Sequence, residues 1–320
     1  MPWSPGLFCA HRSHTVSARF RLAAPAFTRI LRVMGVLAHS APRRVSGPWA
    51  LTVKNLLFPQ FCRQCGSRLL TEENGYFCPA CWEASPRITR PFCTCCGRPH
   101  QSMVGLGARA NFPCADCRAR PPRHVGRIYG AAVYDGPLGE AVRLLKFQGK
   151  RRLAGPIGEV MAGFAEQEMD IAGYDLLVPV PLHTVRARAR GFNQSALLAA
   201  EIAPRFAGAR ISEALHRIRP TRTQSKLHGE EERRANVRGA FAALGEGFHG
   251  KRVLLIDDVV TTAVTVSECA AALRRAGAQE VDVFAATLAV VSPQRALLAR
   301  ILATGSAALL DFRHELGDKR

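Results

Sequence analysis

The chain has 320 residues, of which 48% are hydrophobic, and a formal net charge of +19. This length and apolar content allow one domain with a sizeable core plus a small module, and they exclude a wholly disordered protein. Residues 1–123 hold seventeen Lys and Arg against four acids, a basic surplus that favours polyanions or phosphorylated substrates as partners. No uncharged apolar segment reaches the roughly 20 residues of a membrane-spanning helix, so we expect no membrane span.

Residues 1–50 contain no Asp or Glu and show no long hydrophobic period. We therefore expect residues 1–55 to be a basic, disordered extension, with Met34 as an alternative start of the chain. An organelle transit peptide has a similar acid-poor composition, and this alternative stays open. Neither interpretation affects the fold.

Eight of the eleven cysteines fall in four Cys-x-x-Cys pairs. A Cys-x-x-Cys turn directs two thiolates to one tetrahedral ion and a second pair completes the site, so the spacing predicts two structural zinc ions without an open coordination position. Disulfides are the alternative, but paired thiols in a long chain favour a reducing compartment, the cytoplasm. The predicted zinc ligands are Cys62, Cys65, Cys78 and Cys81 for the first ion, and Cys93, Cys96, Cys114 and Cys117 for the second.

The third pair contains an extra thiol, because Cys95 also precedes Cys96. Only Cys93 has the same spacing to Cys96 as the other pairs, so Cys95 is predicted to be a spectator. Cys269 lies on the apolar stripe of a predicted helix and is expected to be a small core residue. We expect the zinc module to occupy residues 56–121.

Beyond Pro121-Pro122, apolar runs alternate with segments of helical period. This alternation predicts an open, mostly parallel sheet flanked by helices, over residues 122–291. Residues 292–320 are expected to form an amphipathic helix with a polar tail. The expected strands are 127–134, 174–181, the apolar run before Asp257, and 281–290; the expected helices start at 138, 153, 196 and 266; and a long charged loop is expected over 215–239.

Two basic clusters follow predicted elements. One, at the end of the first helix, contains Lys146 and Lys150 and is typical of compensation of the helix dipole, although a phosphate contact is an alternative. The other, Arg186, Arg188 and Arg190, follows the strand ending at Pro181. A strand end followed by arginines and a helix start suits an anion site, and a solvated basic loop is the alternative.

The most informative stretch is Arg252 to Thr265, in which an apolar run is followed by Asp257-Asp258 and a Thr-rich turn before a helix. Ligands of open parallel sheets bind outside the carboxyl ends of the strands, and a following helix start attracts phosphate. Carboxylates beside such a turn suit a phosphorylated sugar. The Gly-rich lysine motif of P-loop NTPases is absent from the sequence.

This stretch resembles the phosphoribosyl-pyrophosphate signature of type I phosphoribosyltransferases, and residues 56–291 resemble the ComF (competence protein F) family. The signature carries Gly where Ala263 stands. A left-handed backbone at this position would cost alanine about 1 kcal/mol or more. We therefore expect Ala263 to weaken binding or catalysis.

The resemblance implies a glycosyltransferase of the phosphoribosyltransferase type that binds phosphoribosyl pyrophosphate, or a related sugar phosphate, with Mg²⁺. By this resemblance, Asp257 and Asp258 would bind the ribose hydroxyls and favour the positive charge that develops at C1′. The turn after residue 178 would bind the pyrophosphate. The implied substrate-binding residues are Val259, Val260, Thr261, Thr262, Ala263, Val264 and Thr265 for the 5′-phosphate; Pro179, Val180, Pro181, Leu182 and Arg190 for the pyrophosphate; and Thr223 and Gln224 in a lid over 215–239.

The resemblance also implies a link to DNA uptake in natural transformation. A non-catalytic accessory protein that binds single-stranded DNA or DNA-uptake proteins is therefore the alternative function. The basic zinc module would then supply phosphate contacts whose strength depends on salt.

Overall fold

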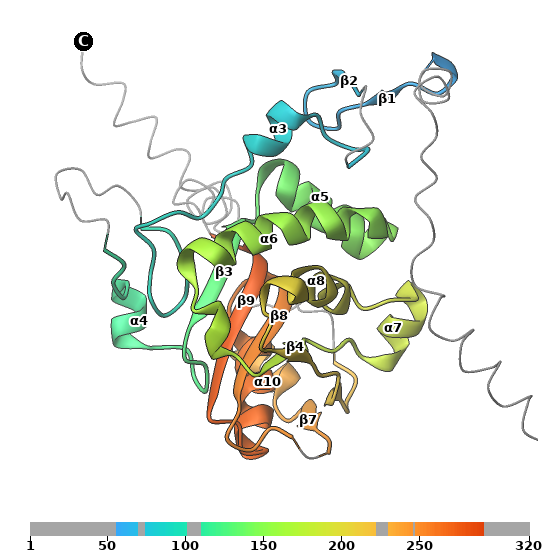
Figure 1. The fold of residues 1–320 in the computed structure, drawn as a ribbon. Coiled ribbons are helices and arrows are strands. Elements are labelled where there is room, and N and C mark those ends of the chain that lie inside the picture. Colours follow the sequence, from blue (N-terminus) through green and yellow to red (C-terminus); the bar gives the residue numbers. More distant parts are fainter. Residues whose placement is uncertain (1–55, 70–73, 101–109, 222–229, 246, 291–320) are drawn as a thin grey trace, which may run out of the picture. The chain divides into compact units, whose positions relative to one another are not determined.

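The computed structural model describes residues 56–69, 74–100, 110–221, 230–245 and 247–290 (Figure 1). The expectations for residues 1–55 and for the tail 292–320 lie outside these ranges. The described residues from Leu57 onward belong to one compact unit. No helix among the described residues is long and apolar enough to cross a membrane.

The core of this unit is a five-stranded sheet in which every neighbouring pair is parallel, in the order β3-β9-β8-β4-β5. Its three central strands are buried almost throughout, as parallel strands covered on both faces must be. This confirms the predicted fold class. The strands are β3 (Ile128–Val133), β4 (Leu176–Pro179), β5 (Arg210–Ile211), β8 (Arg252–Val260) and β9 (Glu280–Leu288).

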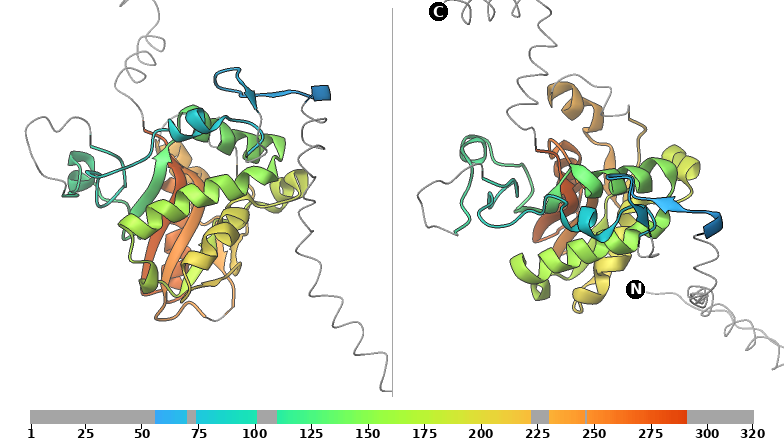
Figure 2. Two further views of the ribbon diagram at one scale, coloured as in Figure 1. Left: turned by 45° about the horizontal axis from the view of Figure 1, so that its top comes forward. Right: turned by 90° about the horizontal axis from the view of Figure 1, so that it is seen from above.

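Helices cover the sheet on two sides. The chain moves along the sheet in one direction through α5, α6 and α8 and returns from β8 to β9 through α10, so right-handed crossovers place α10 on the opposite face. Helices α6 and α8 pack against each other over one face, and in the view from above α6 and α9 lie on opposite sides of the strands (Figure 2). The helices are α5 (Gly136–Gln148), α6 (Ala154–Glu168), α7 (Thr184–Arg190), α8 (Gln194–Ile202), α9 (Glu230–Val237) and α10 (Val264–Arg275).

The described parts of the charged segment, residues 215–221 and 230–239, contain more regular structure than the expected loop. They contain β6 (Leu215–Arg217), which pairs with β7 (Phe241–Ala243) in an antiparallel ribbon, and they contain α9. Leu215 and Val237 are buried and supply the apolar contacts that a purely charged loop would lack. Three short 3-10 turns occur elsewhere among the described residues, at Arg151–Leu153, Ile171–Gly173 and Ala203–Arg205.

The cysteine-rich part consists of two similar halves. Each first knuckle closes through a glycine with positive φ, Gly66 (74°) or Gly97 (69°), and each second pair begins at the N-cap of a short helix. In both halves the amide of the glycine donates to the carbonyl of the first cysteine, at 2.8 Å and 2.9 Å. The short elements are β1 (Gln60–Phe61), β2 (Arg68–Leu69), α3 (Pro79–Glu83) and α4 (Ala115–Ala119).

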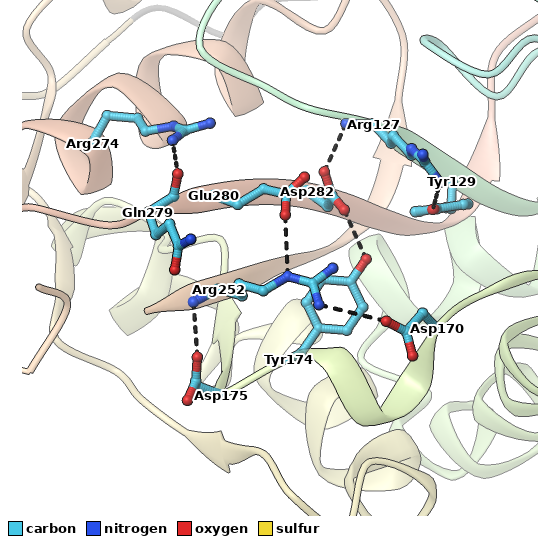
Figure 3. Close-up of polar contacts among 10 residues, drawn as sticks. All are labelled: Arg127, Tyr129, Asp170, Tyr174, Asp175, Arg252, Arg274, Gln279, Glu280 and Asp282. Carbon is cyan, nitrogen blue, oxygen red and sulfur yellow. Dashed lines mark hydrogen bonds and ion pairs between the residues drawn. The ribbon is translucent and has the colours of Figure 1, made fainter. Parts of the chain in front are cut away.

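The amino ends of the strands are joined by a polar network (Figure 3). Asp282 on β9 is buried and accepts the amide of Arg127 at 2.7 Å and the hydroxyl of Tyr174 at 2.8 Å. Arg252 Nε lies 3.1 Å from Glu280, and the Arg252 amide donates to Asp175 at 2.9 Å. Both oxygens of the buried carboxylate are therefore used within the fold.

Candidate functional site

The opposite, carboxyl end of the sheet carries the paired carboxylates. Strand β8 does not stop before them, as the sequence suggested, but continues through both to Val260, because β9 pairs with it as far as Leu288. Residues 261–263 then form a short loop, and α10 begins at Val264. Ala263 is the N-cap residue and has φ 59°, the left-handed conformation for which the signature normally supplies glycine.

Asp257 faces the interior and is 9% exposed. Its Oδ1 accepts the hydroxyl of Ser195, at the start of α8, at 3.2 Å and the amide of Asp258 at 2.9 Å. Burial, followed by the negative charge of Asp258, raises the pKa of Asp257 to about 7. The carboxyl group of Asp257 can therefore gain or lose a proton near neutral pH.

Asp258 is 2% exposed, and its two oxygens differ. Oδ1 lies 2.9 Å from the ammonium of Lys146, in the last turn of α5. Oδ2 is buried and has no hydrogen-bond partner among the described residues. The main-chain carbonyl of Asp258 accepts the hydroxyl of Thr287 from β9 at 3.1 Å, which fixes the backbone beneath the carboxylate. One unpaired oxygen beside one paired oxygen suits a donor or a cation supplied by a ligand.

Lys146 and Ser195 are the two residues of this site that the sequence did not predict. Lys146 was assigned to the basic end of a helix, and Ser195 had no role. Both are far from Asp257 and Asp258 in the sequence, and neither lies in a motif with the carboxylates. Only the fold, which places the end of α5 and the start of α8 beside β8, brings them together.

The loop after β8 lines a small cavity of about 40 Å³ at the start of α10. Thr262 Oγ1 is buried there without a hydrogen-bond partner among the described residues. A helix start offers amides that its own helix does not use, so this cavity suits a small anion. All of the predicted 5′-phosphate residues line it: Val259, Val260, Thr261, Thr262, Ala263, Val264 and Thr265.

The turn after β4 offers few donors for an anion. Pro179 and Pro181 carry no amide hydrogen, and the amide of Val180 donates to Ile256 at 2.9 Å. The Val180 carbonyl also accepts from Asn193 at 3.1 Å. Of the four predicted residues, only Leu182 has an amide for which no partner is found in the described part of the chain.

Arg190 lies near this turn, at the end of α7. It donates to the buried Gln194 at 3.0 Å and lies over the ring of Phe147, with 5.4 Å from guanidinium carbon to ring centre. Burial lowers the pKa of Arg190, and the charge of Asp258 opposes this shift. The arginine is therefore close enough to Asp258 to sense its charge. Thr223 and Gln224, predicted in the lid, lie outside the described residues.

The structure brings the eight predicted zinc ligands into two groups of four. Within each group the sulfurs all lie within 4.8 Å of one another. A tetrahedral zinc with Zn–S bonds of about 2.3 Å requires sulfurs roughly 3.8 Å apart, close to the 3.7 Å between Cys65 and Cys78 and the 3.9 Å between Cys96 and Cys114. Cys95 stays outside the second group. Both groups therefore fit structural zinc.

A larger hollow of about 900 Å³ adjoins the 261–263 loop. It lies between the second cysteine group, α9 and the start of α10, and Arg98 crosses it by donating to the Thr261 carbonyl at 3.2 Å. Basic side chains outnumber acidic ones on its wall. They are Arg98, Arg120, Arg123, Arg234 and Arg238, with Asp116, Glu231 and Glu268 as the acids.

Comparison with known proteins places this architecture. A double zinc ribbon domain matches residues 53–118, and a phosphoribosyl transferase domain matches residues 193–296. DNA utilization protein YhgH of Salmonella typhimurium is 32% identical over 232 residues, which is 72% of this chain and 97% of that protein. The chain belongs to the ComF family.

Two further ComF relatives are more distant. Competence protein F of Haemophilus influenzae is 26% identical and covers 70% of this chain and 94% of its own length. Competence protein ComFC of Bacillus subtilis is 26% identical and covers 62% of this chain and 78% of its own length. The resemblance to the ComF family seen in the sequence is thereby confirmed, together with its zinc ribbon and its phosphoribosyltransferase domain.

Proposed function

We propose that this ComF protein binds phosphoribosyl pyrophosphate, with Mg²⁺, at the carboxyl end of β8. The observation that carries the proposal is the continuity of three features: the buried Asp257-Asp258 pair, the loop with a left-handed residue at 263, and the start of α10. Carboxylates accept hydrogen bonds from sugar hydroxyls, and the helix start attracts the phosphate of the same molecule.

In this proposal Asp257 and Asp258 take the 2′ and 3′ hydroxyls of the ribose. Asp258 Oδ2, buried and without a partner among the described residues, is the acceptor that a hydroxyl would satisfy. The cavity around Thr262 takes the 5′-phosphate. Both carboxylates also favour the positive charge that develops at C1′ when the bond to pyrophosphate breaks.

The donor atoms fit Mg²⁺, a hard cation that prefers oxygen ligands. The diphosphate oxygens of the ligand would hold it, near the carboxylates of Asp257 and Asp258. When bound, the ion neutralises charge on the diphosphate. The chain itself binds the rest of the ligand: β8 would orient the sugar, and the 261–263 loop would hold its 5′-phosphate.

We further propose that the ribosyl phosphate is transferred to an acceptor, with release of pyrophosphate. The pyrophosphate would lie near Arg190, with Leu182 as the remaining amide donor of the turn that begins at Pro179. The lid carrying Thr223 and Gln224 would exclude water from the reacting carbon. Residues 56–121 and 122–291 are the zinc module and the transferase domain in this proposal, and eight metal-bound thiols suit the cytoplasm.

Calorimetric titration of the zinc-loaded full chain with phosphoribosyl pyrophosphate, with and without Mg²⁺, tests binding. We expect saturable binding that Mg²⁺ strengthens. Pyrophosphate release with a panel of bases and amines tests transfer. Absence of binding at millimolar ligand would contradict the whole proposal, whereas binding without any release would remove only the transferase step.

A second candidate is the binding of single-stranded DNA. Relatives named for competence and DNA utilization support it, and so does the basic wall of the 900 Å³ hollow beside the 261–263 loop. Contacts with phosphates would make affinity fall steeply with salt. Fluorescence anisotropy with a labelled oligonucleotide should show binding at low salt that disappears near physiological salt. No binding even at low salt would exclude this candidate.

A further inference from the structure

Lys146 contacts the signature carboxylates from outside the signature. It lies in α5, the helix that follows β3. In the sheet, β9 separates β3 from β8. The helix is anchored by a buried stripe that includes Leu138, Val142 and Leu145. Lys146 follows directly after this stripe, and its ammonium reaches Asp258 Oδ1 at 2.9 Å.

This contact differs from the other described ion pairs. The side chain of Lys146 is 21% exposed and that of Asp258 is 3% exposed, the lowest carboxylate value among them. A pair with so little water around it is coupled more strongly than a surface pair. Burial by itself lowers the pKa of Lys146, but the charges of Asp258 and Asp257 outweigh it and the pKa is raised. The lysine therefore carries its charge.

The pairing sets which oxygen of Asp258 is available. Lys146 engages Oδ1, while Oδ2 is buried and has no partner in the described part of the chain. A carboxylate held on one side by a cation has a restricted orientation, so its second oxygen has a fixed direction. The same cation offsets the repulsion between Asp257 and Asp258, which are adjacent in β8.

We infer that Lys146 is the built-in counter-ion of Asp258, a positioning residue that orients the carboxylate and lets the site accept an anionic sugar phosphate without metal. The inference rests on the proposed function. Removal of the lysine charge should change two affinities in opposite directions. A sugar phosphate dianion should bind more weakly, because two carboxylates would be unopposed beside it. Mg²⁺ alone should bind more tightly for the same reason.

The test uses Lys146→Met in the full zinc-loaded chain, titrated at pH 8 with ribose 5-phosphate without metal and, separately, with Mg²⁺ alone. We expect about tenfold weaker ribose 5-phosphate binding and several-fold tighter Mg²⁺ binding. Lys146→Arg keeps the charge and should restore both affinities toward the original values. The matched control is Lys150→Met, four residues further on, since no side-chain contact of Lys150 with a carboxylate occurs among the described residues.

A double-mutant cycle separates positioning from a general effect on folding. In an Asp258→Asn background, Lys146→Met should change ribose 5-phosphate affinity by less than about twofold, because the lysine acts through Asp258. Unchanged affinities in Lys146→Met, or changes of both in the same direction, would overturn the inference. If the original chain binds neither ribose 5-phosphate nor phosphoribosyl pyrophosphate, the proposed function fails, and the Mg²⁺ titration still tests the role of Lys146.

Discussion

The two ends of the central sheet treat buried carboxylates in opposite ways. At the amino end, both oxygens of Asp282 accept hydrogen bonds, from Arg127 and Tyr174. At the carboxyl end, Asp258 keeps one buried oxygen without a partner among the described residues, and Asp257 has a pKa raised to about 7. Burial alone therefore does not mark a binding site in this fold. The proposed binding site is distinguished by a buried carboxylate oxygen, Asp258 Oδ2, that has no hydrogen-bond partner among the described residues.

The largest expected effect on stability lies at the amino end. Asp282→Ala leaves the amide of Arg127 and the hydroxyl of Tyr174 without their acceptor, at a cost of about 2 to 5 kcal/mol for two buried donors. Urea denaturation should show this loss in the free energy of unfolding. Ligand affinity, measured where the variant is still folded, should not change. A large loss of affinity with intact stability would contradict the structural role.

The second prediction concerns the pH dependence of stability at the carboxyl end. Because the folded-state pKa of Asp257 is about 7, above its usual value of 3.8, the folded chain binds more protons between these values. The contribution of Asp257 is fully present below about pH 4 and is lost as pH rises through about 7, on the order of a few kcal/mol.

Asp257→Asn removes this titration. The unfolding free energy of the variant minus that of the original chain should therefore rise from pH 5 to pH 8, because only the original chain loses stability over this range. The raised pKa of Asp282 acts in the same direction in both proteins and cancels in the difference. A difference that is flat across this range would show that Asp257 is already ionised at pH 5.

The third prediction addresses the unpaired oxygen of Asp258. Asp258→Asn replaces a charge-assisted acceptor by a neutral amide, so ribose 5-phosphate should bind about ten- to a hundredfold more weakly, from about 1.5 to 3 kcal/mol. Thermal unfolding should change less than in Asp282→Ala, because the substituted amide still offers an oxygen to Lys146 and Oδ2 has no partner among the described residues. Equal losses of stability in the two variants would remove the contrast between the ends of the sheet.

The smallest effect is expected at Ala263. Its φ of 59° is a conformation that glycine adopts without cost, so Ala263→Gly should relieve about 1 kcal/mol of strain in the 261–263 loop. Ribose 5-phosphate should then bind a few-fold more tightly. Calorimetric titration of the variant checks this. An unchanged or weaker affinity would show that the left-handed conformation of Ala263 does not cost the bound chain more than the free chain.

The sequence was sufficient for the features that depend on local pattern. The apolar runs around Val253 and Val281 predicted the buried parallel strands, and the Cys-x-x-Cys spacing selected Cys93 over Cys95. The position of Ala263 in the signature predicted its backbone conformation. In each case the information lies within a few residues, where steric and hydrogen-bonding rules act.

The remaining features depend on the packing of distant segments. The contact between Lys146 and Asp258 requires α5 and β8 to meet, and the Ser195 contact requires α8 to pack on β8. The hydrophobic periodicity of a sequence does not indicate which polar side chain of one element contacts a carboxylate of another. The regular structure of residues 215–221 and 230–239 was underestimated for a related reason, since two buried residues, Leu215 and Val237, anchor segments dominated by charge.

The most direct test of the contrast between the two ends is a carboxyl-carbon NMR titration of the chain labelled at aspartate, with and without ribose 5-phosphate. We expect Asp257 to titrate near pH 7 in the free protein, its pKa to fall when the sugar phosphate binds, and the Asp282 titration to be unaffected. Assignment uses the Asp257→Asn and Asp282→Asn variants. An Asp257 pKa near 4 in the free protein, or one that the ligand leaves unchanged, would show that the carboxyl end of the sheet is not the incomplete site described above.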